Sequence, residues 1–370
     1  MFINRLLLAV LFALSFNMQI LFAIEKPQNP FEKPKIQNKE IINNADIDNT
    51  INNSKKPSNK IKISTDTKIK KEEFYNPKTI TIATNYANNS VGKVICSLIN
   101  YNQHVTGFDR VTKQTSGSTE NMNKLEKGEV DFAIVPASMI FDKIQNQSNE
   151  NNKFSKNYRF MLSLGDEVLN FMVNKYSKIT SIDDIKGKII DVGSKNSASY
   201  TFLQKILKQK KWTDNDFSGI EYLKFSDKIH ALCSNKVDVS FIYGGIPDTR
   251  VSNITNFCEI RLISIDDELI KNISSSNYFI NKEIIPGEFY LGNPIEINTL
   301  GSPTLLISSN NVEKLSAYNL ANLIIDNLNT LSKIHPAFNI SPLKKIADNQ
   351  NQIPYHQGVK LLFQEKNLLQ

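Results

Sequence analysis

Two stretches of this chain carry nearly the same sequence: KGEVDFAIVPAS at residues 127–138 and SNKVDVSFIYGG at residues 234–245. Each follows a segment of helical character, starts with a turn signal and ends in a short apolar run. This order predicts a helix, a tight turn and a buried strand in both places. Asp131 corresponds to Asp238, so the second copy comes 107 residues after the first.

The segments beside these copies keep the same spacing. The stretch KTITIAT from residue 78 has a counterpart in KIIDVGS from residue 188, and RVTKQT from residue 110 has one in IEYLKF from residue 220. Each first strand runs into a polar loop and then a helical stretch. The sequence therefore predicts two β-α-β-α-β units, at residues 78–140 and 187–245, with chance similarity between α/β segments as the alternative.

Strands that alternate with helices predict the α/β class, with parallel strands and helices on both faces of a sheet. Ligands of such sheets bind outside the carboxyl ends of the strands. We expect two α/β lobes whose loops face each other across a ligand cleft, joined by crossover strands at residues 167–174 and 301–309. A single continuous sheet, or loop-bearing edges that face apart, would contradict this arrangement.

The first residues have the composition of an export signal. Arg5 precedes an apolar run at residues 6–16, and Ala23 offers a small residue for processing. An uncleaved anchor is the alternative, because residues 6–24 are almost long enough to span a bilayer. Both alternatives predict a periplasmic protein, and the second adds a tether to the inner membrane. Residues 24–75 are rich in Asn, Lys, Pro and Glu, which predicts a disordered leader that is a spacer or a tether.

These assignments divide the chain into five predicted parts. They are a signal peptide or anchor (1–23), the leader (24–75), the first part of lobe 1 (76–172), lobe 2 (173–298) and the return to lobe 1 (299–370). The last helical stretches are expected to pack back on lobe 1.

Charge and motif content exclude several classes of function. The formal net charge of +7 does not predict a nucleic-acid partner, because much of the excess Lys lies in the leader. Metal-ligand spacing, a nucleophile elbow and a phosphate-binding Gly-Lys loop are all absent from the sequence. We expect no metal, no cofactor, no enzymatic activity and a monomeric protein. The four histidines lie in separate segments, and His335 and His356 are predicted to be caps or turn residues.

The three cysteines divide into a predicted pair and a single thiol. Cys233 and Cys258 both fall in lobe 2, and in an exported protein they predict a disulfide. Cys96 lies on an apolar helix face and is predicted to be a buried thiol.

Polar loops follow four strands that should end at the cleft. Their sequences are TNYANNS (84–90), TSGSTEN (115–121), GSKNSAS (193–199) and YGGIPD (243–248). The second and third begin helices, so their backbone N–H groups and hydroxyls could hold a carboxylate or phosphate oxygen. Ordinary capping and turn chemistry explains each loop singly. Together the four loops favour an anion-binding cleft.

Several of these motifs resemble the TAXI-type solute receptors of TRAP transporters. The similar stretches are QTSGSTENMNKLEKGEVDFAIVPAS, ITSIDDIKGKIIDVGSKNSAS, ALCSNKVDVSFIYGGIP and HPAFNIS with the later IPYHQGVKLLFQEK. The resemblance covers about residues 78–365. It implies a type II periplasmic-binding-protein fold that closes on a small organic anion, often an amino acid such as glutamate. It also implies delivery of this carboxylate to a TRAP-type membrane permease.

The resemblance also assigns the ligand contacts by position. They are Thr84, Asn85, Tyr86, Ser116, Gly117, Ser118, Thr119, Ser138, Ser197, Ser199, Tyr243, Gly244, Gly245 and Pro247.

Two functions follow from these observations. The first is a receptor that captures a small carboxylate for transport. The second is an envelope interaction protein that keeps the receptor fold without transport. The long leader favours the second function, as does a first loop that keeps only Val91 and Gly92 of the family's glycine-rich loop.

Overall fold

A computed structural model of the chain describes residues 79–85, 90–101, 110–147, 157–339, 343–349 and 353–369. The predicted signal or anchor and the leader lie outside these ranges, as does Tyr86. Within the described ranges, no helix has both the length and the apolar character needed to cross a membrane.

The two predicted repeats form the same five elements in the same order. The first contains β1 (Ile80–Thr84), α3 (Ser90–Tyr101), β2 (Arg110–Gln114), α4 (Ser118–Glu126) and β3 (Phe132–Pro136). The second contains β5 (Ile189–Asp191), α6 (Ala198–Lys210), β6 (Gly219–Glu221), α7 (Phe225–Cys233) and β7 (Val239–Gly244). In each repeat the first strand lies between the other two and pairs with both in parallel. The predicted β-α-β-α-β units are therefore confirmed.

The repeated aspartates make equivalent contacts in the two units. Asp131 Oδ2 accepts a hydrogen bond from Thr81 N at 2.8 Å, and Asp131 N donates to Thr81 O at 3.0 Å. Asp238 Oδ2 accepts from Ile189 N at 2.8 Å, and Asp238 N donates to Ile189 O at 2.8 Å. Each aspartate thus joins the approach to the third strand to the start of the first strand.

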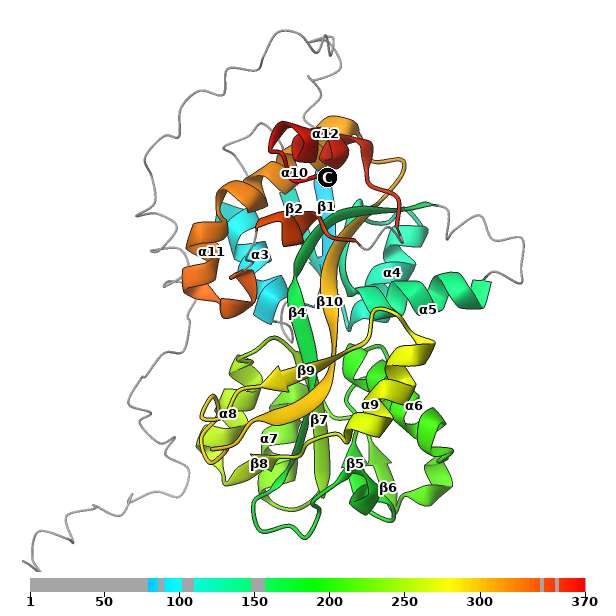
Figure 1. Cartoon of the computed structure of the whole chain (residues 1–370), viewed down its shortest axis with the longest axis vertical. Coiled ribbons are helices and arrows are strands. Elements are labelled where there is room, and N and C mark those ends of the chain that lie inside the picture. The colour runs from blue at the N-terminus through cyan, green and yellow to red at the C-terminus, as the bar shows by residue number, and fades with distance from the viewer. Residues whose placement is uncertain are drawn as a thin grey trace, which may run out of the picture. The chain divides into compact units, whose positions relative to one another are not determined.

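Two long strands connect the repeats and pass through both lobes (Figure 1). They are β4 (Tyr158–Asn174) and β10 (Ile297–Ser309), which pair antiparallel. One end of β10 pairs with β3 of lobe 1, and the far half of β4 pairs with β7 of lobe 2. The crossover strands are thus longer than the predicted segments.

The described strands form one hydrogen-bonded path in the order β2-β1-β3-β10-β4-β7-β5-β6. The expectation that no continuous sheet joins the lobes is therefore wrong. The reason is strand length: β4 has 17 residues and β10 has 13, so each contributes to the sheet of both lobes. The two-lobed arrangement persists because each lobe has an apolar core of its own, although Phe279 of lobe 2 joins the core of lobe 1.

The remaining elements complete the two lobes. α5 (Ala137–Gln147) belongs to lobe 1 and η3 (Ile182–Ile185), η4 (Asp214–Asp216), α8 (Thr249–Phe257), β8 (Ile260–Leu262), α9 (Asp267–Ser276) and β9 (Asn281–Ile285) belong to lobe 2. The chain then returns with α10 (Lys314–Asp326), α11 (Leu328–Ile334), η5 (Pro336–Phe338), η6 (Leu343–Ala347) and α12 (Gln357–Glu365). Figure 1 shows α10, α11 and α12 in the lobe that holds β1 and α3.

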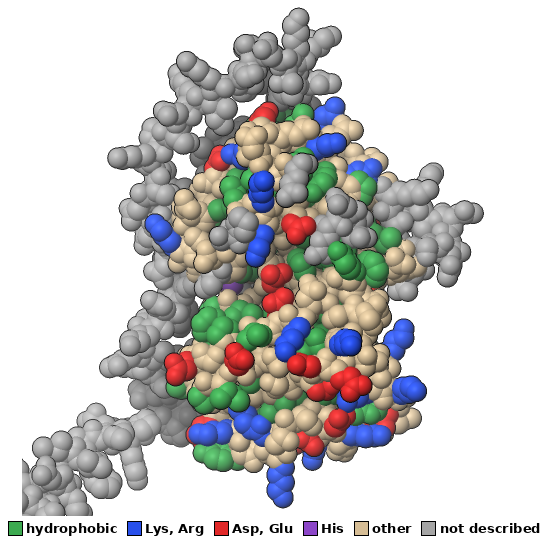
Figure 2. Space-filling view, in the orientation of Figure 1, with side chains coloured by type: hydrophobic (Ala, Val, Ile, Leu, Met, Phe, Trp, Pro, Cys, Tyr) green, Lys and Arg blue, Asp and Glu red, His purple; other side chains and the backbone are tan. Residues whose placement is uncertain are grey.

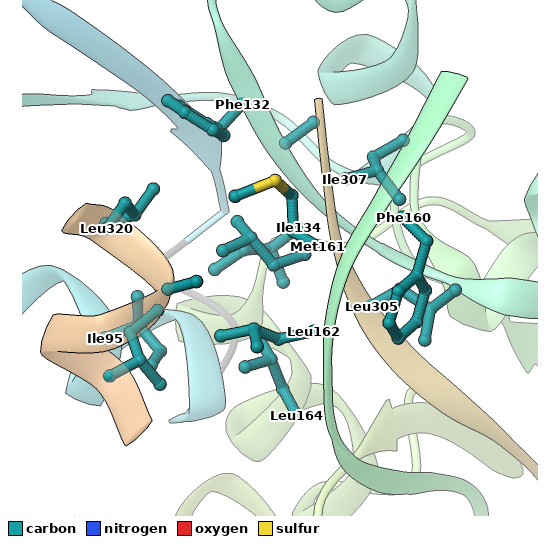
Figure 3. Packing of buried hydrophobic residues seen from close by; sticks show 14 of the residues in the cluster. Ile95, Phe132, Ile134, Phe160, Met161, Leu162, Leu164, Leu305, Ile307 and Leu320 are labelled. Carbon is teal, nitrogen blue, oxygen red and sulfur yellow. The ribbon is translucent and has the colours of Figure 1, made fainter. Parts of the chain in front are cut away.

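Separate hydrophobic cores stabilise the lobes. Figure 3 shows the core of lobe 1, where side chains of β3, β4 and β10 meet Ile95 of α3 and Leu320 of the returning α10. In lobe 2, alternate residues of β4 enter two clusters: Phe171 packs in one and Met172 in the other. This alternation is expected for a strand that is buried on both faces.

The change of core lies within the crossover strands. On β4, Leu164 belongs to the core of lobe 1 and Val168 to a core of lobe 2. On β10, Leu300 belongs to a core of lobe 2 and Leu305 to the core of lobe 1. The fold is thus the predicted type II periplasmic-binding-protein arrangement, with two α/β lobes joined by crossover strands.

The three cysteines and two of the histidines, His335 and His356, occupy structural positions. Cys233 and Cys258 form a disulfide with an Sγ–Sγ distance of 2.00 Å, which joins the C-terminal ends of α7 and α8. Cys96 is a buried free thiol, and burial raises its pKa to about 12. His335 Nδ1 accepts from Ala337 N and His356 Nδ1 from Gly358 N, so the predicted turn and cap roles are confirmed.

Candidate functional site: the cleft between the lobes

The loop after β2 touches the loop after β5 across the boundary between the lobes. Ser116 Oγ accepts a hydrogen bond from Asn196 Nδ2 at 3.0 Å. Thr119 N, in the first turn of α4, donates to Asn196 O at 3.3 Å. The loop-bearing edges of the two lobes therefore face each other, as the ligand cleft requires.

Gly117 permits this close approach. It precedes α4, and a Cβ atom at this position would lie 2.2 Å from Asn196 O. Any other residue would push the two loops apart. Ser118 follows in the first turn of α4 and is half-buried.

The start of α4 also holds a carboxylate of the chain itself. Ser116 N and Ser116 Oγ donate to Glu120 Oε2 at 2.8 and 2.7 Å. Both hydrogen bonds lower the pKa of Glu120, and the one from the backbone N–H has the larger effect. In this structure two of the donors predicted for a ligand carboxylate, both from Ser116, are therefore occupied by Glu120.

The loop after β1 lies beside the loop after β2. Thr84 is buried, and its backbone O accepts from Thr115 N at 3.3 Å. Asn85 Nδ2 donates to Ser116 O at 3.3 Å. The predicted contacts Thr84, Asn85, Ser116, Gly117, Ser118 and Thr119 are thus brought together, and Tyr86 lies outside the described residues.

In lobe 2, the predicted serines support helix and strand ends. Ser197 caps α6, where its Oγ accepts from Tyr200 N at 3.2 Å. Ser199 Oγ accepts from Tyr243 N at 2.8 Å. Tyr243 OH donates to Ser302 O on β10 at 3.0 Å. Tyr243 is buried, so this bond anchors lobe 2 to a crossover strand.

The turn after Tyr243 is shaped by an ion pair. Gly244 and Gly245 are buried and precede a cis peptide bond between Ile246 and the half-buried Pro247. A Cβ atom on Gly244 would lie 1.8 Å from Asp248 Oδ2. Asp248 Oδ2 accepts from Arg250 Nη2 at 2.6 Å, and the same nitrogen donates to Tyr243 O at 2.8 Å.

Ser138 lies where lobe 1, lobe 2 and the crossover strands meet. Its N donates to Ser302 Oγ at 3.1 Å, and its O accepts from Asn277 Nδ2 of lobe 2 at 3.0 Å. The side chain is fully buried, and within the described part of the chain Ser138 Oγ has no hydrogen-bond partner. Ser138 therefore keeps an unused hydroxyl at this junction.

The crossover strands add buried polar residues that sequence reasoning missed. Thr304 Oγ1 of β10 donates to Glu167 Oε2 of β4 at 2.5 Å, and both residues are about 1 % exposed. The sequence signal that could have identified Glu167 is its place as a charged residue at the start of the apolar stretch EVLNFMVN. Asn170, also fully buried, donates through Nδ2 to Ile242 O at 3.2 Å.

A second missed cluster lies beneath the loop after β5. Lys228 Nζ pairs with Asp191, and Ser240 Oγ donates to Asp191 Oδ2 at 2.6 Å. Asp191 Oδ1 accepts from Gly193 N at 3.0 Å, which fixes the first residue of the loop. Burial lowers the pKa of Lys228, and Asp191 opposes this effect.

A pocket of about 370 Å³ lies beside the crossover strands, and its lining includes none of the predicted ligand contacts. It is lined by Ser163, Gly165, Asp166, Phe279, Asn281, Glu283, Pro303, Leu305, Ala337, Asn339, Lys345, Asp348 and Asn349. Figure 2 shows acidic side chains gathered on this face near the boundary between the lobes. Burial and then the charge of Asp166 raise the pKa of Glu283 to about 7.

Metal chemistry has no support in the described ranges. No group of three or more His, Cys, Asp or Glu side chains there is arranged to hold a metal ion.

Comparison with known proteins gives one family match and several distant structural similarities. Residues 83–366 match the NMT1-like family. The chain is similar to the periplasmic aliphatic sulphonate binding protein SsuA from Escherichia coli, with 14 % identity, a TM-score of 0.42, and 80 % of this chain and 89 % of that chain covered. The alkanesulfonate-binding protein SsuA from Xanthomonas axonopodis pv. citri has 16 % identity and a TM-score of 0.41, with 80 % and 81 % covered.

A putative L-cystine ABC transporter from Listeria monocytogenes has 16 % identity and a TM-score of 0.44, with 72 % of this chain and 99 % of that chain covered. Identities and scores this low carry no conclusion about ligands. The family match spans most of the chain and nearly all of its described residues. The chain belongs to the NMT1-like family.

Proposed function

We propose that this protein is an extracytoplasmic solute-binding receptor for a small carboxylate, such as the amino acid glutamate. One observation carries the proposal: the first turn of α4 in lobe 1 faces the loop before α6 in lobe 2, through the bond from Thr119 N to Asn196 O. Helix starts are positive and bind anions. Two lobes that present such a start across a cleft suit the capture of an anionic solute.

In this proposal the solute replaces contacts that the lobes make with each other. When the loops separate, the carboxylate takes the position of Asn196 O at Thr119 N, and the lobes then close around it. The unused hydroxyl of Ser138 donates to a second polar group of the solute. The remaining predicted residues of the four loops shape the cleft, and the protein has no catalytic role.

The wider assignment rests on the resemblance and on the N-terminal sequence. We propose a periplasmic protein, exported by residues 1–23, that passes its solute to a TRAP-type permease. The leader at residues 24–75 then keeps the receptor near the membrane if the signal remains uncleaved.

A thermal-shift screen tests the receptor function. Amino acids and dicarboxylates are added to the purified protein, and a bound solute at one hundred times its Kd adds about 2.7 kcal/mol to the free energy of unfolding. Thr119→Pro removes the N–H group at α4, so it should abolish the shift, whereas Ser275→Ala on the exposed side of α9 should not. A complete screen without a shift would argue against a receptor.

A second function has one specific observation in its favour. Glu120 already occupies the Ser116 donors, and Asn196 occupies Thr119 N, which suits a protein that keeps the receptor fold without transport. Such an envelope interaction protein would bind a partner through its surface and leader. Partner binding should survive Ser138→Ala and Thr119→Pro. Its loss when residues 24–75 are deleted would then support this function.

A further inference from the structure

Two residues of lobe 2 are buried against lobe 1. They are Asn277 and Phe279 in the connection between α9 and β9, at residues 277–280, whereas Tyr278 between them is exposed. Phe279 is only 3 % exposed and belongs to the hydrophobic core of lobe 1. Its ring meets Phe141 of α5 edge-on, with 6.0 Å between the ring centroids. A residue of lobe 2 therefore completes the core of the opposite lobe.

Asn277 directs this insertion through three hydrogen bonds. Its Oδ1 accepts from Phe279 N at 3.1 Å, which shapes the turn. Its Nδ2 donates across the boundary to Ser138 O at 3.0 Å and to Asp142 Oδ1 at 2.7 Å. Asn277 is 1 % exposed, so water does not replace these partners while the lobes stay together.

Asp142 of α5 receives a second contact from lobe 2. Its other oxygen, Oδ2, pairs with Lys205 of α6 in a half-buried ion pair. One carboxylate of lobe 1 thus holds two separate helical elements of lobe 2. The α5 helix that carries it is in turn joined to β10 through Ser138 N and Ser302 Oγ.

We propose that residues 277–279 are a latch that holds the two lobes closed in the absence of a solute. Opening this side of the molecule exposes Phe279 to water and removes both partners of Asp142. The latch therefore sets the fraction of solute-free molecules that are closed. A bound solute has to supply only the remaining free energy of closure. This inference does not depend on which function the cleft serves.

The substitution Asn277→Asp tests the latch with little change in side-chain size. The new carboxylate still accepts from Phe279 N, but it faces Asp142 and Ser138 O with no donor. Like charges this close disfavour each other. We expect the ratio of closed to open molecules to fall roughly tenfold, which corresponds to about 1.4 kcal/mol.

A compensating variant separates this effect from general damage. In Asn277→Asp/Asp142→Asn the donor and acceptor exchange places, so the hydrogen bond across the boundary returns. Lys205→Met removes only the ion pair and should shift the ratio less, in the same direction as Asn277→Asp. Ser275→Ala is the control, because its Oγ donates within α9 to Asn272 O at 2.9 Å.

The separation of the lobes can be measured as the distance between two spin labels. The labels are attached to Lys360→Cys in lobe 1 and Gln209→Cys in lobe 2, because both positions are exposed. Without any solute, the parent should give one short distance, and Asn277→Asp should add a population at a longer distance. The compensated variant, which also lacks the ion pair with Lys205, should match Lys205→Met. An unchanged distance distribution in Asn277→Asp overturns the latch. A long-distance population in the compensated variant as large as that of Asn277→Asp overturns it as well. If Asn277→Asp does not fold, Lys205→Met decides, since an unchanged distance there also contradicts the proposal.

Discussion

Asn121 and Lys228 occupy the same position of the two repeats and donate to the same carbonyl of the following strand. Asn121 Nδ2 lies 2.8 Å from Ile134 O, and Lys228 Nζ lies 3.3 Å from Phe241 O. One repeat uses a neutral amide where the other buries a charge. The repeats therefore share a contact whose chemistry differs between the lobes.

The sheet register shows why lobe 2 can hold the charge. Asp191 pairs with Ser240 in lobe 2, and the equivalent pair in lobe 1 is Ala83 with Ala133. Lobe 2 thus places a carboxylate and a hydroxyl where lobe 1 has two methyl groups. Lys228 depends on these two polar side chains.

Replacing Lys228 should destabilise lobe 2 strongly. Lys228→Met leaves Asp191 buried and without its counter-charge, and we expect a loss of about 3 to 5 kcal/mol in the free energy of unfolding. Urea denaturation measures this loss. Lys224→Met, an exposed lysine at the start of the same helix, should change little. The triple variant Asp191→Ala/Lys228→Asn/Ser240→Ala copies lobe 1 and should recover most of the loss; no recovery would contradict the equivalence of the two sites.

The disulfide should contribute measurably to stability. It closes a loop with a sequence separation of 25 residues, so its removal should cost about 3 kcal/mol in the chain-entropy description. The variant Cys233→Ala/Cys258→Ala should lower the denaturation midpoint to that of the reduced parent. Reduction should leave the midpoint of the variant unchanged, and a shift there would point to the thiol of Cys96.

Gly117→Ala should hold the loops apart. The added methyl group would lie 2.2 Å from Asn196 O, so the contact between α4 and the loop before α6 cannot form. Small-angle scattering should show a larger radius of gyration than for the parent. Ser118→Ala, the next residue, is the matched control, and equal scattering profiles for all three proteins would refute the expected effect.

Glu283 should make stability depend on pH. Burial, with the nearby Asp166 charge, raises the pKa of Glu283 from its ordinary value of 4.5 to about 7. Between these two values the folded protein binds more protons than the unfolded chain, so stability falls as the pH rises through this window. Lys345 and Asp348 line the same pocket. The charge of Lys345 opposes the rise in the pKa of Glu283.

The variant Glu283→Gln removes this carboxyl and should be more stable than the parent at pH 8, by about 1 kcal/mol after allowance for solvent screening. Melting temperatures measured from pH 5 to pH 8 should fall less steeply for the variant. Glu268→Gln on α9 is the control, because its carboxyl is exposed. Identical slopes for parent and Glu283→Gln would contradict the raised pKa.

Sequence reasoning was most informative where two copies could be compared. The recurrence of Asp131 and Asp238 predicted the strands and helices of both units, because a repeated turn and strand leaves few ways to fold. The length of the crossover strands was not predictable in this way. Arg159 and Ser163 interrupt the apolar pattern of β4, and its pairing partners lie far away along the chain.

The cleft shows a different limit. Ser116, Gly117 and Ser199 were predicted because helix starts use such residues, and this local signal does not depend on the partner lobe. Glu120 was visible in TSGSTEN, yet only the folded loop shows that it takes the Ser116 donors. Asn277 and Phe279 lacked any local signal, since their role depends on α5 of the other lobe.

The core of lobe 1 gathers residues from both ends of the described chain, including Ile82 and Phe363, whereas the cores of lobe 2 draw only on the stretch between Val168 and Leu300. During synthesis, lobe 2 therefore has all of its buried side chains before lobe 1 does. We expect lobe 2 to fold first, because lobe 1 cannot complete its core until α10 and α12 have been synthesised.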